Sequence, residues 1–514
     1  MTDNATTAAD TTKATGAAAA ERIRPRDRDT LINGLRAGVV PRIGQQHIQV
    51  GRVNELNALL ADITRIGDDG SAARFIIGEY GSGKTFFLNL VRSVALQRKL
   101  VTVHADLSPD RRLHATGGQA RSLYSELMRS MSTRAKPDGG AVGSVVERFV
   151  TSALTEGNQN GTAPESIMRA RLAQLSELTG GYDFAEVIAK YWQGHDTGNE
   201  QLKSDAVRWL RGEFATRTDA RAALGVRTIV DDANFYDQLK LLAKFVRLAG
   251  FDGLLVCLDE MVNLYKLANS QARKSNYEQI LRILNDALQG YAEGIGFIFG
   301  GTPDFLTDSR RGLYSYAALQ SRLAENTFAT AGRVDLSGPV IRLSALTPED
   351  LFILLTKLVH VHAGGDPANY LLPSEALQAF MAHCSNRIGD AYFRTPRNTI
   401  RGFLDLLAIL EQNPEQQWDQ IIDAIPIGEE TNPDLEPLPA TEGTVSAPPE
   451  GGGSVTLTAA PGAGVVGPPS WAVDPADNGS VTVEHKNNGD DSRDDDGDGD
   501  YGRGGDDELT SFKL

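Results

Sequence analysis

The chain contains very little cysteine. Cys257 and Cys384 are the only cysteines among 514 residues, which is too few for a zinc cluster or a disulfide framework. Long apolar runs are missing too, and the absence of an 18-residue apolar stretch excludes a transmembrane helix. Residues 1–20 are rich in Thr and Ala and have no charged start followed by an apolar run, so they do not resemble a secretory signal. We expect a cytoplasmic protein without a membrane partner, whose residues 1–20 are disordered.

Aromatic residues are scarce at 7%, and the formal net charge of −16 is concentrated at the C-terminal end. From Glu429 onward the chain carries 19 of its 67 acidic and 4 of its 51 basic residues, which leaves 48 acidic and 47 basic residues in 1–428. This nearly neutral part neither demands nor excludes nucleic acid. We expect residues 428–514 to form a disordered acidic tail. Residues 494–499 resemble part of a calcium loop, but Gly505 stands where such a loop needs Glu, which favours a solvated acidic run.

A glycine-rich segment follows the first apolar strand. The spacing Gly78-x-x-x-x-Gly83-Lys84-Thr85 fits the nucleoside-triphosphate P-loop at every position. Such a loop turns backbone N–H groups toward an anion, and the helix that begins at Lys84 adds the positive end of its dipole. Lys84 is expected to reach the β and γ phosphates of ATP and Thr85 to ligate Mg²⁺. A chance glycine-rich turn is the alternative, and the apolar strand before it and the helical pattern after it argue against that. The candidate ATP-binding residues of this loop are Gly78, Glu79, Tyr80, Gly81, Ser82, Gly83, Lys84 and Thr85.

Apolar strands that alternate with helical patterns predict an α/β fold, with a parallel sheet covered by helices on both faces. The expected strands are residues 74–77, 100–106, 254–258, 296–300 and 340–343, and a helix is expected over about 276–293. The expected organisation is a disordered start (1–20), an N-terminal element with the first part of a P-loop ATPase domain (21–132), a helical insertion (133–235), the rest of that domain (236–345), a helical lid (346–427) and the acidic tail (428–514).

Two acidic residues end the third apolar strand. Asp259 and Glu260 directly follow the apolar residues 254–258, which is where a Walker B element stands. Asp259 is expected to hold Mg²⁺, directly or through water, and Glu260 to polarise the water that attacks the γ phosphate. The alternative is a pair of surface acids. Their position at the end of a buried strand in a P-loop protein favours the catalytic interpretation.

The next strand is followed by Thr302, in Gly300-Gly-Thr-Pro303. Its hydroxyl could orient the water or sense the γ phosphate, and a simple strand-to-loop turn is the alternative. Arg322 and the pair Arg310-Arg311 come later, before the last strand. Arg322 is the candidate to stabilise transition-state charge in a neighbouring subunit, whereas arginines on exposed helices are ordinarily only solvated.

Two further arginines are candidate ATP contacts. Arg397, in Arg394-Thr-Pro-Arg397, opens the last lid helix, where it could fold over the γ phosphate; its alternative is an ion pair at the helix start. Arg52 follows Gly51 just before a helix, and a Gly-Arg turn ahead of a nucleotide domain often packs near the adenine.

The order of these elements resembles that of AAA+ ATPases. Within that class, the closest resemblance is to the ATP-binding proteins of BREX bacteriophage-exclusion systems, especially the form that accompanies a helicase in phage-growth-limitation-type loci. It covers about residues 21–425. The segments that carry it are residues 34–41 (Gly-Leu-Arg-Ala-Gly-Val-Val-Pro), 78–85, 105–108 (Ala-Asp-Leu-Ser), 301–305 (Gly-Thr-Pro-Asp-Phe) and 321–323 (Ser-Arg-Leu).

The resemblance implies an oligomeric ATPase of antiphage defence that works with helicase, methyltransferase or phosphatase-like partners and with DNA, bound directly or through those partners. Our leading hypothesis is an ATP-hydrolysing AAA+ protein that assembles or remodels a DNA-associated defence complex. The alternative is a regulatory switch in which ATP binding changes assembly with little motor activity. A small-molecule kinase is disfavoured because Glu260 is suited to activating water. We find no second motor domain, which argues against a helicase. No winged-helix pattern follows the lid, so any DNA contact must come from the basic N-terminal patch, the insertion, oligomerisation or a partner.

Overall fold

The computed structural model describes residues 22–329 and 333–428. The predictions made for residues 1–20 and for the acidic chain from Glu429 onward, including its calcium-loop-like run, lie outside these residues. No helix within the described ranges is both long enough and apolar enough to cross a membrane.

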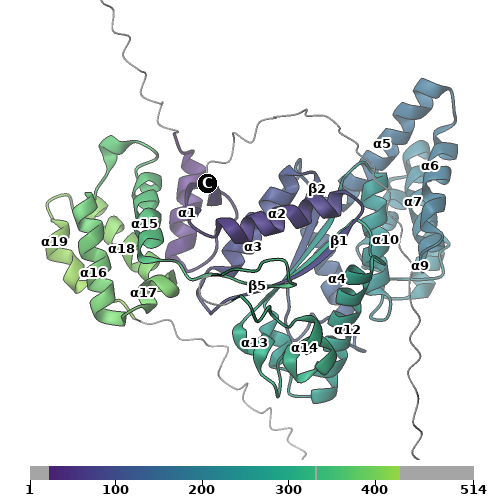
Figure 1. Cartoon of the computed structure of the whole chain (residues 1–514). Coiled ribbons are helices and arrows are strands. Elements are labelled where there is room, and N and C mark those ends of the chain that lie inside the picture. The colour runs from purple at the N-terminus through teal and green to yellow at the C-terminus, as the bar shows by residue number, and fades with distance from the viewer. Residues whose placement is uncertain (1–21, 330–332, 429–514) are drawn as a thin grey trace, which may run out of the picture. The chain divides into compact units, whose positions relative to one another are not determined.

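Five parallel strands form one sheet in the order β2-β3-β4-β1-β5 (Figure 1). All five lie where the sequence predicts apolar strands, so the α/β prediction is confirmed. Because the strands are parallel, their C-terminal ends meet along one edge, where ligands of open α/β sheets bind. β4 pairs with both β1 and β3 and so separates them. The strands are β1 (Ser71–Ile77), β2 (Leu100–Asp106), β3 (Gly253–Asp259), β4 (Ile295–Gly301) and β5 (Val340–Arg342).

Alternate residues of the strands pack into two different hydrophobic cores. Ile76, for example, faces the core formed with α2 and α3. Phe75 and Ile77 face the opposite core, where the ring of Phe75 stacks on that of Phe299 with 4.8 Å between centroids. Helices therefore cover both faces of the sheet (Figure 1). The helices against the first face are α2 (Val53–Gly67) and α3 (Lys84–Gln97), and those against the second include α4 (Gln119–Ser130), α10 (Phe235–Leu248) and α12 (Ser270–Gln289).

The helix α12 begins six residues before its predicted start and ends four residues before its predicted end. The side chain of Asn269 accepts hydrogen bonds from the backbone N–H groups of Gln271 and Ala272, which caps the helix start. Gly290, with φ 77°, ends it. The sequence prediction relied on apolar periodicity and passed over both of these capping signals.

A group of helices between β2 and β3 extends the second core (Figure 1). Phe245 of α10 joins them to the sheet, because its ring contacts Phe149 of α5 and Phe184 of α7 at centroid distances of 5.3 and 5.5 Å. Phe184 also meets Trp209 of α8 edge-on. These helices are α5 (Val142–Asn160), α6 (Pro164–Leu172), α7 (Gly181–Thr197), α8 (Glu200–Leu210) and α9 (Arg217–Leu224).

The C-terminal helices share a separate core with α1, the first helix that the structure describes. Leu31 of α1 is fully buried in the cluster that contains Phe403 of α18. The Nε of Arg36 donates to Asp405 Oδ1 at 3.0 Å, which joins the same two helices. These helices are α1 (Pro25–Arg36), α15 (Pro348–His362), α16 (Ser374–Ile388), α17 (Ala391–Arg394), α18 (Arg397–Gln412) and α19 (Trp418–Ile421).

Three short helices lie between β3 and β5 along the chain: α11 (Val262–Tyr265), α13 (Pro303–Thr307) and α14 (Ala317–Arg322).

Candidate functional site

The loop of residues 78–85 connects β1 to α3 and has the backbone of an anion-binding nest. Gly81 and Gly83 have φ of 75° and 85°, which side-chain-bearing residues rarely adopt. Lys84 Nζ donates to the carbonyl oxygens of Gly78 and Glu79 at 3.0 and 2.9 Å, so the ammonium lies over the loop. The Oγ of Ser82 is buried and has no hydrogen-bond partner among the described residues. An orphaned donor and an ammonium beside these glycines fit a polyphosphate.

The electrostatics of Lys84 also point to an anion. Burial lowers the pKa of Lys84, while the carboxylates of Asp259, Glu260 and Glu79 oppose that shift. The positive charge of Arg397 lowers the pKa further. Two cations therefore converge on one partly desolvated space, and a bound polyphosphate would relieve their repulsion.

A hydrogen bond connects the start of α3 to the end of β3. Thr85 Oγ1 donates to Asp259 Oδ2 at 2.7 Å, and the backbone N–H of Glu260 donates to Asp259 Oδ1 at 2.9 Å. One carboxylate oxygen of Asp259 thus meets the start of α3 and the other is held by the next backbone N–H, although Asp259 is only 7% exposed. A hydroxyl and a carboxylate are hard oxygen donors that suit Mg²⁺, which takes its remaining ligands from phosphates and water. This donor set needs no larger cluster, and residues 22–329 and 333–428 contain no group of three or more His, Cys, Asp or Glu side chains arranged for a metal.

Glu260 occupies a strained turn directly after β3. Its φ of 55° lies in the left-handed region, which costs a residue with a side chain about 1 kcal/mol. The next backbone N–H, that of Met261, donates to Gly300 O at 3.1 Å and fixes the turn against β4. The exposed side chain of Glu260 lines the same cavity as Lys84 and Thr85. Because of this sharp turn, the side chain of Glu260 points in a different direction from that of Asp259.

Thr302 follows β4, between the P-loop strand and the strand that ends in Asp259. Gly78 N donates to Gly301 O at 3.1 Å, so the start of the P-loop is bonded to the residue before Thr302. Thr302 is buried, and its Oγ1 accepts from Phe305 N at 3.4 Å, which caps α13. The strand-to-loop turn that was the alternative interpretation of Thr302 is thus present in the structure. A hydroxyl that accepts one bond can still donate its own proton, so capping is compatible with a sensing role.

A third carboxyl at this edge was not among the predicted site residues. Asp106 ends β2 and pairs in register with Asp259, so both side chains emerge on the same face of the sheet. Burial and then the charge of Asp259 raise the pKa of Asp106. The signal was present in the sequence, because Asp106 follows an apolar strand just as Asp259 does.

The arginines between β4 and β5 differ in their surroundings. Arg322 Nε donates to Asn285 Oδ1 at 2.6 Å and its Nη1 to Ala318 O at 2.9 Å, so this half-buried side chain is held against α12. The guanidinium carbon of Arg311 lies over the ring of Tyr265, 5.3 Å from its centre. Arg310 is exposed.

Arg52 lines the cavity beside the P-loop and contacts that loop. Its guanidinium donates to the carbonyl oxygens of Ser82 and Gly83, in the latter case at 3.4 Å, and its Nε donates to Ser344 O, which follows β5. Burial lowers the pKa of Arg52, opposed by Glu55 and Asp350. Arg52 therefore connects the P-loop to the segment that leads into α15.

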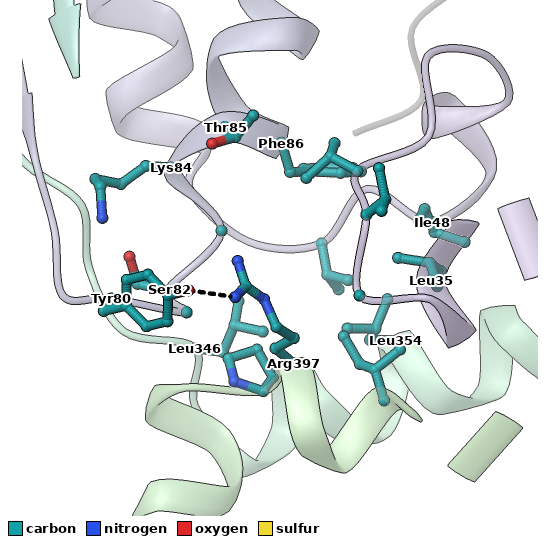
Figure 2. Close-up of a pocket in the computed structure, with 18 of the residues that line it drawn as sticks. Leu35, Ile48, Tyr80, Ser82, Lys84, Thr85, Phe86, Leu346, Leu354 and Arg397 are labelled. Atoms are coloured by element: carbon teal, nitrogen blue, oxygen red, sulfur yellow. Dashed lines mark hydrogen bonds between the residues drawn. The ribbon is translucent and has the colours of Figure 1, made fainter. Parts of the chain in front are cut away.

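A cavity joins the P-loop to the C-terminal helices. Figure 2 shows Tyr80, Ser82, Lys84, Thr85 and Phe86 on one side of it, with Leu35 and Ile48 from the N-terminal segment and Leu346, Leu354 and Arg397 from the C-terminal one. Its wall is polar at the loop and apolar elsewhere, a division that suits a phosphate chain and a flat base.

The apolar part of this wall was not predicted from the sequence. Residues 34–41 were noted only as a segment of resemblance, although they carry several lining residues. No local pattern marks the others, because they come together only through the contact of α1 with the C-terminal helices. The apolar lining residues are Leu35, Val39, Val40, Ile48, Val50, Phe86, Leu346, Leu354, Pro396 and Ile400.

The chain belongs to the family of BREX system ATP-binding proteins BrxC/D, whose family model matches residues 23–425. The match covers the sheet, the helices on both of its faces and the C-terminal helices. No curated protein matches the chain. Membership supports a bacterial antiphage defence protein that binds ATP and acts in a system of several proteins.

Proposed function

We propose that this chain is an AAA+ ATPase that hydrolyses ATP and couples hydrolysis to the assembly or remodelling of a DNA-associated defence complex. The observation that carries the proposal is the 2.7 Å hydrogen bond between Thr85 and Asp259. It joins the P-loop helix to the acidic end of β3 and leaves Glu260 at the rim of the same cavity. The family's description as BREX system ATP-binding proteins supports the defence role.

The proposed roles follow from chemistry and position. Lys84 and the N–H groups of the loop bind the β and γ phosphates. Thr85 and Asp259 hold Mg²⁺, which supplies charge neutralisation at those phosphates. Glu260 accepts a proton from the attacking water, and Thr302 orients that water from the end of β4. Arg52 supports the loop that binds ATP.

The C-terminal helices are the proposed lid. The apolar lining of the cavity is suited to the adenine, and Arg397 of α18 reaches the phosphate end. Because the lining residues come from both the N-terminal segment and the C-terminal helices, a bound nucleotide would contact both. Such a contact is a way for nucleotide state to change the position of the lid.

The test of the function compares two acids at opposite ends of β3. Asp259→Asn is expected to lower ATP hydrolysis by the full-length chain at least about 10²-fold, since it removes a proposed Mg²⁺ ligand. Asp252→Asn, at the other edge of the sheet, is the matched control and should leave hydrolysis unchanged. Phosphate release is measured with and without double-stranded DNA. Unchanged hydrolysis in Asp259→Asn would contradict the proposal, and equal rates with and without DNA would favour a switch driven by protein partners.

The proposed oligomer requires an arginine that reaches the ATP of a neighbouring subunit. Arg322 is the residue that the sequence favours for this role, yet its bonds to Asn285 and Ala318 would have to break first. The exposed Arg310 needs no such rearrangement, which makes it the better candidate.

A mixing experiment distinguishes the two arginines. We expect Arg310→Ala to lower hydrolysis at least about 10²-fold, in the range of arginine fingers, and Lys84→Ala subunits to restore part of it by supplying Arg310 in trans. Arg322→Ala is tested in parallel by phosphate release. Rescue of Arg322→Ala alone would return the role to Arg322, and no rescue of either variant would show that neither acts between subunits.

A further inference from the structure

Tyr80 and Arg397 form a contact between the P-loop and α18. Arg397 Nη1 donates to Tyr80 Oη at 3.1 Å, and the guanidinium carbon lies 4.9 Å from the centre of the Tyr80 ring. The two interactions use different parts of the tyrosine, its hydroxyl and its π face. Both side chains line the nucleotide cavity (Figure 2).

The position of Arg397 in its helix does not explain this arginine. It is the first residue of α18, directly after Pro396. A positive charge is unfavourable at a helix N-terminus, where the backbone N–H groups already provide partial positive charge. The positive charge of Arg397 therefore does not stabilise the start of α18. Any favourable interaction of this residue comes from the groups that its guanidinium contacts.

The surroundings of Arg397 constrain its side chain from two elements. Gly38 of the N-terminal segment has φ 71°, and a Cβ placed there would lie 3.9 Å from Arg397 Cδ. The aliphatic part of Arg397 thus runs beside this glycine while its guanidinium meets Tyr80. The charge is close enough to Lys84 to lower the pKa of that lysine. Two cations are in this way held near the phosphate-binding loop.

We infer that Tyr80 is a positioning residue that orients Arg397 toward the terminal phosphate of ATP, so that the site binds ATP in preference to ADP. The inference rests on the proposed function. A guanidinium has five N–H donors in a rigid fork. The tyrosine hydroxyl accepts from one of its nitrogens, and its central carbon lies over the tyrosine ring. An oriented arginine loses less conformational freedom when it meets a phosphate than one on an unrestrained side chain.

The test measures affinities for a non-hydrolysable ATP analogue and for ADP, both with Mg²⁺, by displacement of a fluorescent nucleotide from the full-length chain. Tyr80→Phe keeps the ring and removes the hydroxyl, and we expect about fivefold weaker binding of the ATP analogue, the size of one hydrogen bond. Tyr80→Leu removes both interactions, with an expected loss of about 20-fold. Binding of ADP should change by less than about twofold in both variants, because it lacks the phosphate that Arg397 meets.

A double-mutant cycle separates positioning from a general role in folding. In an Arg397→Ala background, Tyr80→Leu should cause no further loss of affinity for the ATP analogue, because its effect acts through the arginine. Tyr291→Phe, on an exposed tyrosine outside the cavity, is the matched control. Thermal unfolding checks that each variant is folded.

The outcomes distinguish this inference from the proposed function. If Arg397→Ala weakens the ATP analogue but the Tyr80 variants do not, Tyr80 is not a positioning residue and the ATP site stands. If both Tyr80 variants bind the ATP analogue more tightly, Tyr80 holds Arg397 away from the terminal phosphate and the inference is wrong. Independent losses in the cycle would also overturn it. If the wild-type chain binds neither nucleotide, the proposed function itself fails.

Discussion

Glu260→Gln should lower the rate of ATP hydrolysis by about 10³-fold, the contribution of a well-placed general base, while ATP binding changes by less than about twofold. The amide has nearly the shape of the carboxylate but cannot accept the proton of the attacking water. Binding is retained because the P-loop, Thr85 and Asp259 are untouched. Single-turnover hydrolysis and nucleotide affinity, measured on the same preparation, separate the two effects.

The strained backbone at Glu260 makes the control important. Gln and Glu face the same cost at φ 55°, so a difference between them reports on the carboxylate and not on the turn. Glu278→Gln is the matched control, since Glu278 is an exposed carboxylate of α12 that does not line the cavity. Hydrolysis by Glu260→Gln at the wild-type rate would remove Glu260 from the role of base.

Gly300→Ala should abolish most ATP hydrolysis, although residue 300 itself is not a proposed ligand of ATP or Mg²⁺. A Cβ at residue 300 would lie 2.3 Å from Asp259 Oδ1 and 2.9 Å from Leu88 Cδ1. Because Leu88 is packed in the core, the carboxylate must move, and its hydrogen bond to Thr85 is lost. We expect hydrolysis to fall by about 10²-fold or more and stability by about 2 kcal/mol, as for overpacking of a core.

Two measurements accompany this variant. Urea unfolding gives the loss of stability, and the Mg²⁺ concentration needed for half-maximal hydrolysis should rise because Asp259 is displaced. Gly338→Ala provides the matched glycine control, since a Cβ there meets nothing within 4 Å. An active Gly300→Ala with unchanged Mg²⁺ dependence would show that the position of Asp259 is not critical.

The parts of the fold that could be predicted from the sequence are those that depend on local patterns of residues. A strand such as residues 100–106 is mainly apolar, and its observed bounds are Leu100–Asp106. The P-loop and the Asp259-Glu260 pair have fixed spacing relative to such strands. Parallel strands bring their C-terminal ends to one edge, so these residues could be grouped before the sheet order was known.

The remaining features depend on contacts between distant segments. Nothing in the neighbourhood of Arg52 indicates that its guanidinium meets the carbonyl oxygens of Ser82 and Gly83. The partner of Arg322 on α12 is equally hidden, because Asn285 lies on a different helix. Periodicity identifies which face of a helix is buried but does not identify what covers it.

The core shared by α1 and α18 has a consequence for how the protein folds during its synthesis. Arg36 and Asp405 are 369 residues apart in the chain, and a ribosome adding 5–20 residues per second needs roughly 20–70 s to make that length. During this time Leu31 and the apolar side of α1 lack the C-terminal helices that complete their core. α1, the first described helix to be synthesised, is thus among the last to be fully covered.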